Sequence, residues 1–90
     1  MDELRQHEQY FFDDETIAYL ANFVRAYTNP CCLCAPTIGR ELERLGVATR
    51  TLDADARFKT LVGFLDYDVR RPRWLGEDFG IVLFDPPPFF

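Results

Sequence analysis

The spacing of apolar residues predicts a helix in the first third of the chain. Asp13 and Asp14 offer side-chain oxygens that cap a helix, and their charges suit the positive end of its dipole. The apolar residues that follow recur at helical spacing: Ile17, Leu20, Ala21 and Val24, with Phe23 and Tyr27 widening the stripe. Asn29-Pro30 ends this helix, because proline cannot continue it.

Short apolar runs between turn residues predict four strands. They are Cys31–Ala35, Val47–Leu52, Leu61–Tyr67 and Phe79–Phe84. A second helix is predicted over Ile38–Leu45, with Thr37 as its N-cap and Gly46 just after its end. Asp55 caps a short turn over Ala56–Lys59, and the loop Arg70–Gly76 is expected to hold one helical turn at Trp74.

The order of these elements predicts an α/β fold. Strands that are separated by crossovers pair in parallel, so we expect about four mostly parallel strands with flanking helices. Helices must cover both faces of such a sheet, and two good helices are few for four strands. We therefore expect that the edge of the last strand is exposed or that a partner covers it.

Composition narrows the class of protein. The chain has 90 residues, 48% of them hydrophobic, which fits one small domain and excludes a disordered chain. It lacks an apolar run of about 18 residues, so we expect no membrane-spanning segment. Its polar, acidic start is unlike a secretory signal, so we expect no such signal. The net charge of −5 disfavours autonomous binding of nucleic acid through phosphate contacts. Three cysteines crowded together argue against a disulfide framework and indicate a cytoplasmic protein.

The cysteines are also a poor metal site. Cys31 and Cys32 are adjacent in a predicted strand, so they point to opposite faces and cannot grip one ion together. His7 is the only histidine, whereas zinc takes four ligands from spaced pairs. We interpret the thiols as buried apolar groups and expect no metal.

Two segments after predicted strands are candidates for ligand binding. Asp53 follows the second strand, where an acidic residue can accept hydrogen bonds from both hydroxyls of a ribose, or can simply cap the next turn. The turn Ala35–Gly39 holds the place of a glycine-rich nucleotide loop but lacks that motif. A pyrophosphate would fit poorly against Pro36 and Ile38, which leaves a cofactor without phosphates or a plain strand-to-helix connection.

The last residues form the most specific string in the chain. In Asp85-Pro86-Pro87 the prolines fix an extended backbone and remove two N–H donors. The Asp side chain and the proline carbonyls can accept hydrogen bonds from an amine, while a nearby aromatic ring stacks on a base or clamps an alkyl ammonium. The other reading is a proline-rich tail.

A basic cluster precedes the last strand. It consists of Arg70, Arg71 and Arg73, beside Trp74. On an acidic protein such a cluster is either a solvated loop or a means of steering a phosphate-bearing substrate.

Several strings, taken in order, resemble a known family. They are His7–Asp13, Cys31–Thr37, Leu52–Phe58, Tyr67-Asp68 and Asp85–Pro87. In these strings the chain resembles the bacterial branch of the probable N6-adenine methyltransferase-like family. That group is related to eukaryotic methyltransferases that act on a translation-factor lysine or on an adenine of ribosomal RNA. The resemblance implies a partial Rossmann-like class I methyltransferase sheet, with S-adenosylmethionine as the methyl donor.

The resemblance also implies roles for individual residues. The cofactor-binding residues would be Ala35, Pro36, Thr37, Asp53 and Asp68. The catalytic residues would be Asp85, Pro86, Pro87 and Phe89, which match an Asp-Pro-Pro-aromatic motif that binds the target amine. The family has its aromatic directly after the second proline, whereas here Pro88 intervenes. The acceptor would be an adenine in nucleic acid or a protein lysine.

The family continues beyond this motif, so residues 1–90 would form a single truncated domain that holds mainly the cofactor half. Such a domain would need a completing C-terminal partner or would form a homo-oligomer. Two other functions stay open at this point. One is a non-catalytic interaction module that pairs through an exposed strand edge, and the other is a nucleotide-binding fragment without transfer activity.

Overall fold

The first helix forms where its cap and apolar stripe predict it. The computed structural model describes residues 12–86, and α2 spans Asp14–Val24. The Asp13 side chain accepts a hydrogen bond of 2.8 Å from the Thr16 N–H, as an N-cap does. The helix ends at Val24, before Asn29-Pro30, where the sequence predicted its end. Phe23 and Tyr27 are exposed and pack on each other, with ring centroids 5.8 Å apart, so the prediction that they widen the buried stripe is wrong.

A central strand and a crossover helix follow. Strand β1 spans Pro30–Leu33, and α3 spans Pro36–Arg44. The prediction that Thr37 caps α3 is wrong: Pro36 occupies the first turn, where its fixed φ and missing N–H suit a helix start, and Ala35 becomes the N-cap without a side-chain bond. Gly46 follows the helix with a φ of +79°, the left-handed conformation that the predicted helix end requires.

The remaining strands are shorter than their apolar runs. Strand β2 spans Arg50–Asp53, β3 spans Phe64–Asp66 and β4 spans Ile81–Phe84. A 3₁₀ turn, η1, spans Ala56–Phe58 and is capped by Asp55, as predicted. The predicted helical turn at Trp74 is absent, because the segment from 67 to 80 is irregular throughout.

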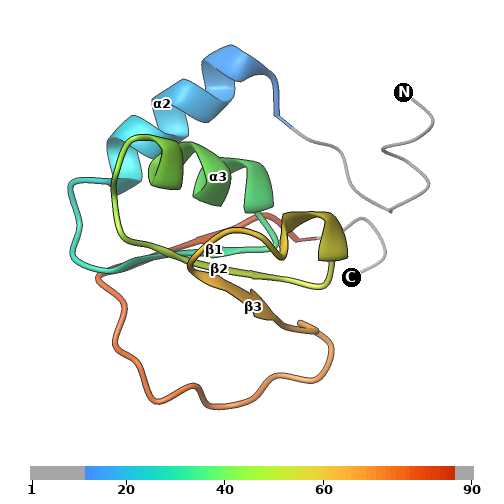
Figure 1. Cartoon of the computed structure of the whole chain (residues 1–90). Coiled ribbons are helices and arrows are strands. Elements are labelled where there is room, and N and C mark those ends of the chain that lie inside the picture. Colours follow the sequence, from blue (N-terminus) through green and yellow to red (C-terminus); the bar gives the residue numbers. More distant parts are fainter. Residues whose placement is uncertain (1–11, 87–90) are drawn as a thin grey trace.

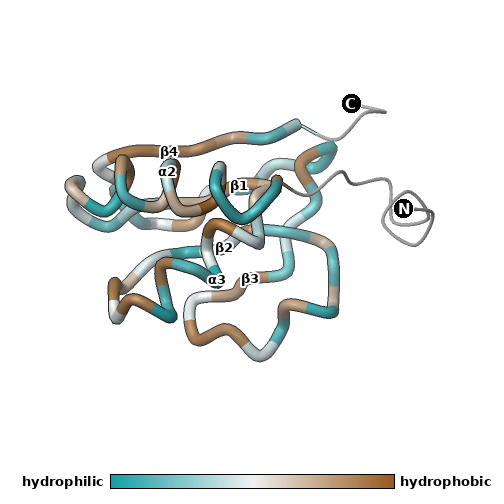
Figure 2. Tube along the Cα trace, turned by 90° about the horizontal axis from the view of Figure 1, so that it is seen from above, coloured by the Kyte–Doolittle hydropathy of each residue, from teal (hydrophilic) through white to brown (hydrophobic). Residues whose placement is uncertain are grey.

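The four strands form one sheet in the order β3-β2-β1-β4, and every pair is parallel. Figure 2 shows this order, with an apolar β4 at one side. The sheet with its flanking helices confirms the predicted α/β class and is part of a Rossmann-like fold. None of the helices among residues 12–86 is long and apolar enough to cross a membrane.

The two faces of the sheet are covered differently. Helices α2 and α3 lie together on one face, while the segment from 67 to 80 passes across the other (Figure 1). The core lies between the helices and the sheet and contains Ala21, Val24, Cys32, Ala35, Ile38 and Leu42. Cys31 lines a cavity on the opposite face, so the prediction that Cys31 and Cys32 point to different faces is confirmed. Among the described residues, only irregular chain covers this second face.

Candidate functional site

The strand order places a reversal of direction within the sheet. The chain runs outward from β1 through β2 to β3, and then crosses to the other side of β1 to form β4. In open α/β sheets, ligands bind beyond the carboxyl ends of the strands at such a reversal. Here the reversal lies between the ends of β1 and β4, where Leu33 pairs with Phe84 and the Asp85 N–H donates to the Leu33 carbonyl at 3.1 Å.

The chain leaves β1 through a left-handed residue. Cys34 has a φ of +57°, which is uncommon for a residue with a side chain, and its N–H donates to the Leu52 carbonyl at 2.8 Å. This conformation turns the chain at once into α3. Ala35, Pro36 and Thr37 form the start of that helix and are all buried. The predicted cofactor turn therefore lies at the end of β1, next to the strand reversal.

Asp53 is the last residue of β2 and is only 2% exposed. Its Oδ2 accepts a hydrogen bond of 3.0 Å from the Asp55 N–H. This local bond shapes the next turn, as one of the two sequence interpretations predicts. The same carboxylate stands at the carboxyl edge of the sheet, as the ribose interpretation requires.

Asp68 lies two residues beyond β3. Its Oδ1 accepts hydrogen bonds from the Arg70 N–H at 2.9 Å and from the Arg70 Nε at 3.2 Å. The bond from the backbone N–H, followed by the bond from the side chain, lowers the pKa of Asp68 below its usual value of 3.8. Asp68 is therefore a carboxylate at neutral pH.

Asp85 follows β4 directly. Burial raises its pKa above the usual value of 3.8, because the charged form loses contact with water. Pro86 is the next residue and is exposed. Pro87 and Phe89, which the sequence also assigns to this motif, lie outside the described residues.

Asp53, Asp68 and Asp85 all affect the pKa of one thiol, that of Cys34. The pKa of Cys34 is raised to about 11, first by burial and then by the charges of Asp53, Asp85 and Asp68. Three carboxylates that follow three different strands therefore lie near enough to the end of β1 for their charges to affect this thiol. Their combined negative field favours a cationic ligand and disfavours a phosphate.

Sequence reasoning missed Cys34 as part of this site. The apolar run at 31–35 reads as one continuous strand, and no cysteine-specific signal marks the left-handed turn inside it. Nor do these acidic groups form a metal site: within residues 12–86, no three His, Cys, Asp or Glu side chains are arranged to hold an ion.

Comparison with known proteins adds one finding. The sequence profile of a protein family described as "Probable N6-adenine methyltransferase" matches residues 3–90. No curated protein and no solved structure matches the chain.

Proposed function

The chain belongs to the family of probable N6-adenine methyltransferases, and from this premise we propose that its carboxyl edge binds S-adenosylmethionine for methyl transfer to an amine nitrogen. The observation that supports the proposal best is the position of Asp53, Asp68 and Asp85, which end or follow β2, β3 and β4 at the carboxyl edge of the sheet. These side chains come from positions far apart in the sequence. They all lie at the carboxyl edge of the sheet, the edge at which open α/β sheets bind their ligands.

The chemistry of the edge fits this methyl donor. S-adenosylmethionine has a positively charged sulfur and an ammonium group, and it has no phosphate. A cluster of carboxylates attracts the two cationic groups. The turn after β1 has Ala35 and Pro36 where a phosphate-binding loop has glycines, so the helix start does not present the open cradle that a pyrophosphate needs.

Each residue at the edge has a proposed task. Asp53 would accept hydrogen bonds from the ribose hydroxyls, and Asp68 would hold the adenine end of the donor. The turn from Ala35 to Thr37 packs against the donor. When bound, the donor supplies a methyl group on a sulfur that is a good leaving group.

The acceptor is bound from the β4 side. Asp85 and the Pro86 carbonyl accept hydrogen bonds from the NH₂ group of the acceptor. These bonds would hold the acceptor nitrogen in line for transfer, in which the carbon–sulfur bond breaks, the carbon–nitrogen bond forms and one amine proton passes to the Asp85 carboxylate or to water. Positioning of this kind accounts for much of the rate. In the sequence motif, the aromatic residue that would stack on the acceptor ring is Phe89, which lies outside the described residues. We propose adenine in a nucleic acid as the acceptor, because its planar base uses both the hydrogen-bond acceptors and the stacking ring.

Methyl transfer tests this function directly. The purified chain is incubated with isotope-labelled S-adenosylmethionine and either an adenine-containing single strand or a lysine-rich protein. We expect label in the strand, recovered as N6-methyladenine after hydrolysis. Label in lysine would instead assign a protein acceptor. Absence of label in both, from a chain that is folded by circular dichroism, would contradict a transferase function for these 90 residues.

The position of β4 favours a second candidate, a module that binds another polypeptide by strand addition. Among the described residues β4 is an edge strand, and its Val82 side chain is half exposed. A module of this kind has no need of the carboxylates at the end of β1. Binding of the methyl-donor product therefore separates the two functions.

A further inference from the structure

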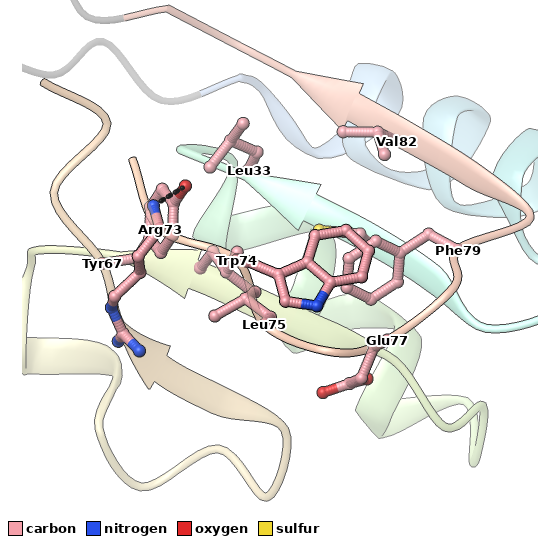
Figure 3. Close-up of a pocket in the computed structure, with 10 residues that line it drawn as sticks. Leu33, Tyr67, Arg73, Trp74, Leu75, Glu77, Phe79 and Val82 are labelled. Atoms are coloured by element: carbon pink, nitrogen blue, oxygen red, sulfur yellow. Dashed lines mark hydrogen bonds between the residues drawn. The ribbon is translucent and has the colours of Figure 1, made fainter. Parts of the chain in front are cut away.

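A cavity lies on the face of the sheet that the helices leave uncovered. It has a volume of about 200 Å³ and lies between the sheet and the segment from 67 to 80. Figure 3 shows residues that line it, among them Trp74, Leu75 and Phe79 from the segment and Leu33 and Val82 from the strands. Its lining comprises Cys31, Leu33, Leu52 and Val82 from the strands, and Tyr67, Arg73, Trp74, Leu75, Glu77 and Phe79 from the segment. None of these residues belongs to the carboxylate cluster around Cys34.

The walls of the cavity are rich in aromatic rings. Tyr67, Trp74 and Phe79 contribute three of them within a segment of 13 residues. Trp74 is 83% exposed, although an indole ring is among the most costly side chains to leave in water. An exposed indole beside an apolar cavity offers a stacking surface to a flat ligand.

Polar groups at the rim are held in fixed positions. The Arg73 Nη2 donates to the Asp66 carbonyl at 2.9 Å, and its guanidinium carbon lies 5.7 Å from the centre of the Tyr67 ring. The Tyr67 hydroxyl accepts from the Arg73 N–H at 3.2 Å. On the other side, Glu77 accepts from the Arg50 Nε at 2.7 Å. A fixed donor and a fixed acceptor therefore stand at the mouth of an apolar, aromatic cavity.

We propose that this cavity binds a nucleobase. An apolar cavity of about 150 Å³ suffices to bind benzene, so this volume admits a larger planar ring. The edge of a base has both donors and acceptors, which match Glu77 and Arg73, and its faces stack on Trp74. Arg70 and Arg71 lie a few residues before Trp74 in the sequence, and their positive charges favour a phosphate next to the base. The base comes from a free nucleoside or from a single strand, and it binds independently of the methyl donor.

Fluorescence of Trp74 tests this proposal, because it is the only tryptophan in the chain. Adenosine is titrated into the full chain under selective excitation of the indole. We expect saturable quenching. Absence of saturable quenching from the folded chain would overturn the proposal.

Two matched substitutions test whether the base lies in the cavity. Val82→Phe fills the floor of the cavity and is tolerated, since Val82 is 50% exposed and phenylalanine suits a strand. Val62→Phe makes the same change at a residue that is 94% exposed and does not line the cavity. We expect at least tenfold weaker adenosine binding in Val82→Phe and unchanged binding in Val62→Phe. Equal affinities in the two variants would overturn the proposal.

Further arms identify the source of the base and separate this site from the methyl-donor site. A short adenine homopolymer that binds more tightly than adenosine, with an affinity that falls as salt rises, identifies a strand. Equal affinities identify a free nucleoside.

Asp53→Ala is expected to leave the quenching by adenosine intact. Loss of quenching in Asp53→Ala would place the base at the carboxyl edge and overturn the cavity site. If quenching persists but S-adenosylhomocysteine does not bind, only the proposed methyl-donor site fails.

Discussion

Replacing Gly39 with alanine is expected to lower the free energy of unfolding by about 2 kcal/mol, although alanine is the better helix former. Gly39 lies on α3 where the helix crosses β2, and a Cβ built there collides with the Thr51 hydroxyl oxygen. Both residues are buried, so neither can move into solvent. A domain of this length has about 5–13 kcal/mol of stability in total, so the loss is a substantial fraction. Urea denaturation measures it.

A double-mutant cycle tests whether the contact with Thr51 causes the loss of stability in Gly39→Ala. Thr51→Ala removes the oxygen that the new Cβ would meet, and Thr51 Oγ1 is buried without a hydrogen-bond partner among the described residues. We expect Gly39→Ala to cost less in the Thr51→Ala background than in the wild type. If Gly39→Ala leaves the wild type as stable as before, the close packing of α3 on β2 is wrong.

Asp85→Asn is expected to slow methyl transfer on the order of a hundredfold, the usual loss when a positioned hydrogen-bonding group at a reaction centre is removed. Asparagine keeps the size of the side chain and one acceptor oxygen, but it loses the negative charge and replaces the second acceptor oxygen with a donor. Asp78→Asn is the matched control, because Asp78 is exposed on the segment from 67 to 80. Initial rates with labelled S-adenosylmethionine measure both variants. Equal rates for Asp85→Asn and the wild type would remove Asp85 from the mechanism.

The raised pKa of Asp85 gives this prediction a second readout. The folded chain binds the Asp85 proton more tightly than the unfolded chain does, because burial raises the folded pKa. The stabilising contribution is therefore fully present below the ordinary value of 3.8 and is lost as pH rises through the raised value. Asp85→Asn does not titrate, so at neutral pH we expect it to be slightly more stable than the wild type. As the pH is lowered, the rate of methyl transfer should begin to fall at a pH above the ordinary carboxyl pKa of 3.8, because Asp85 becomes protonated there.

Local signals in the sequence were sufficient to predict the elements of the fold. Asp13 and Asp55 cap the elements that they were expected to cap, and Gly46 ends α3. These features depend on a few neighbouring residues, so the sequence contains the information. The parallel order follows from the alternation of strands and crossovers.

Features that depend on packing or backbone geometry were not predictable. The apolar run at 31–35 gives no sign that Cys34 adopts a left-handed conformation. The strand therefore ends at Leu33 and not at Ala35, where the sequence predicted its end. Thr37 is a good cap by residue type, but Pro36 starts the helix one residue earlier. Phe23 has the spacing of a core residue, yet no described element covers it.

The same limit applies to the candidate site. The positions of Asp53, Asp68 and Asp85 after three strands were predicted from the sequence, because carboxyl ends of parallel strands share one edge. The sequence did not predict that all three raise the pKa of Cys34, because this effect depends on the turn after β1. The cavity beside Trp74 was also missed, because the sequence placed a helical turn where the chain is irregular.

Calorimetric titration of S-adenosylhomocysteine into the purified chain tests the central claim most directly. Asp53→Ala removes the buried carboxylate at the end of β2, and Asp66→Ala, at an exposed position at the end of β3, is the matched control. We predict micromolar binding to the wild type and to Asp66→Ala, and binding at least tenfold weaker to Asp53→Ala. A folded wild-type chain that releases no heat of binding, or an Asp53→Ala chain that binds as well as the wild type, would contradict a methyl-donor site at the carboxyl edge.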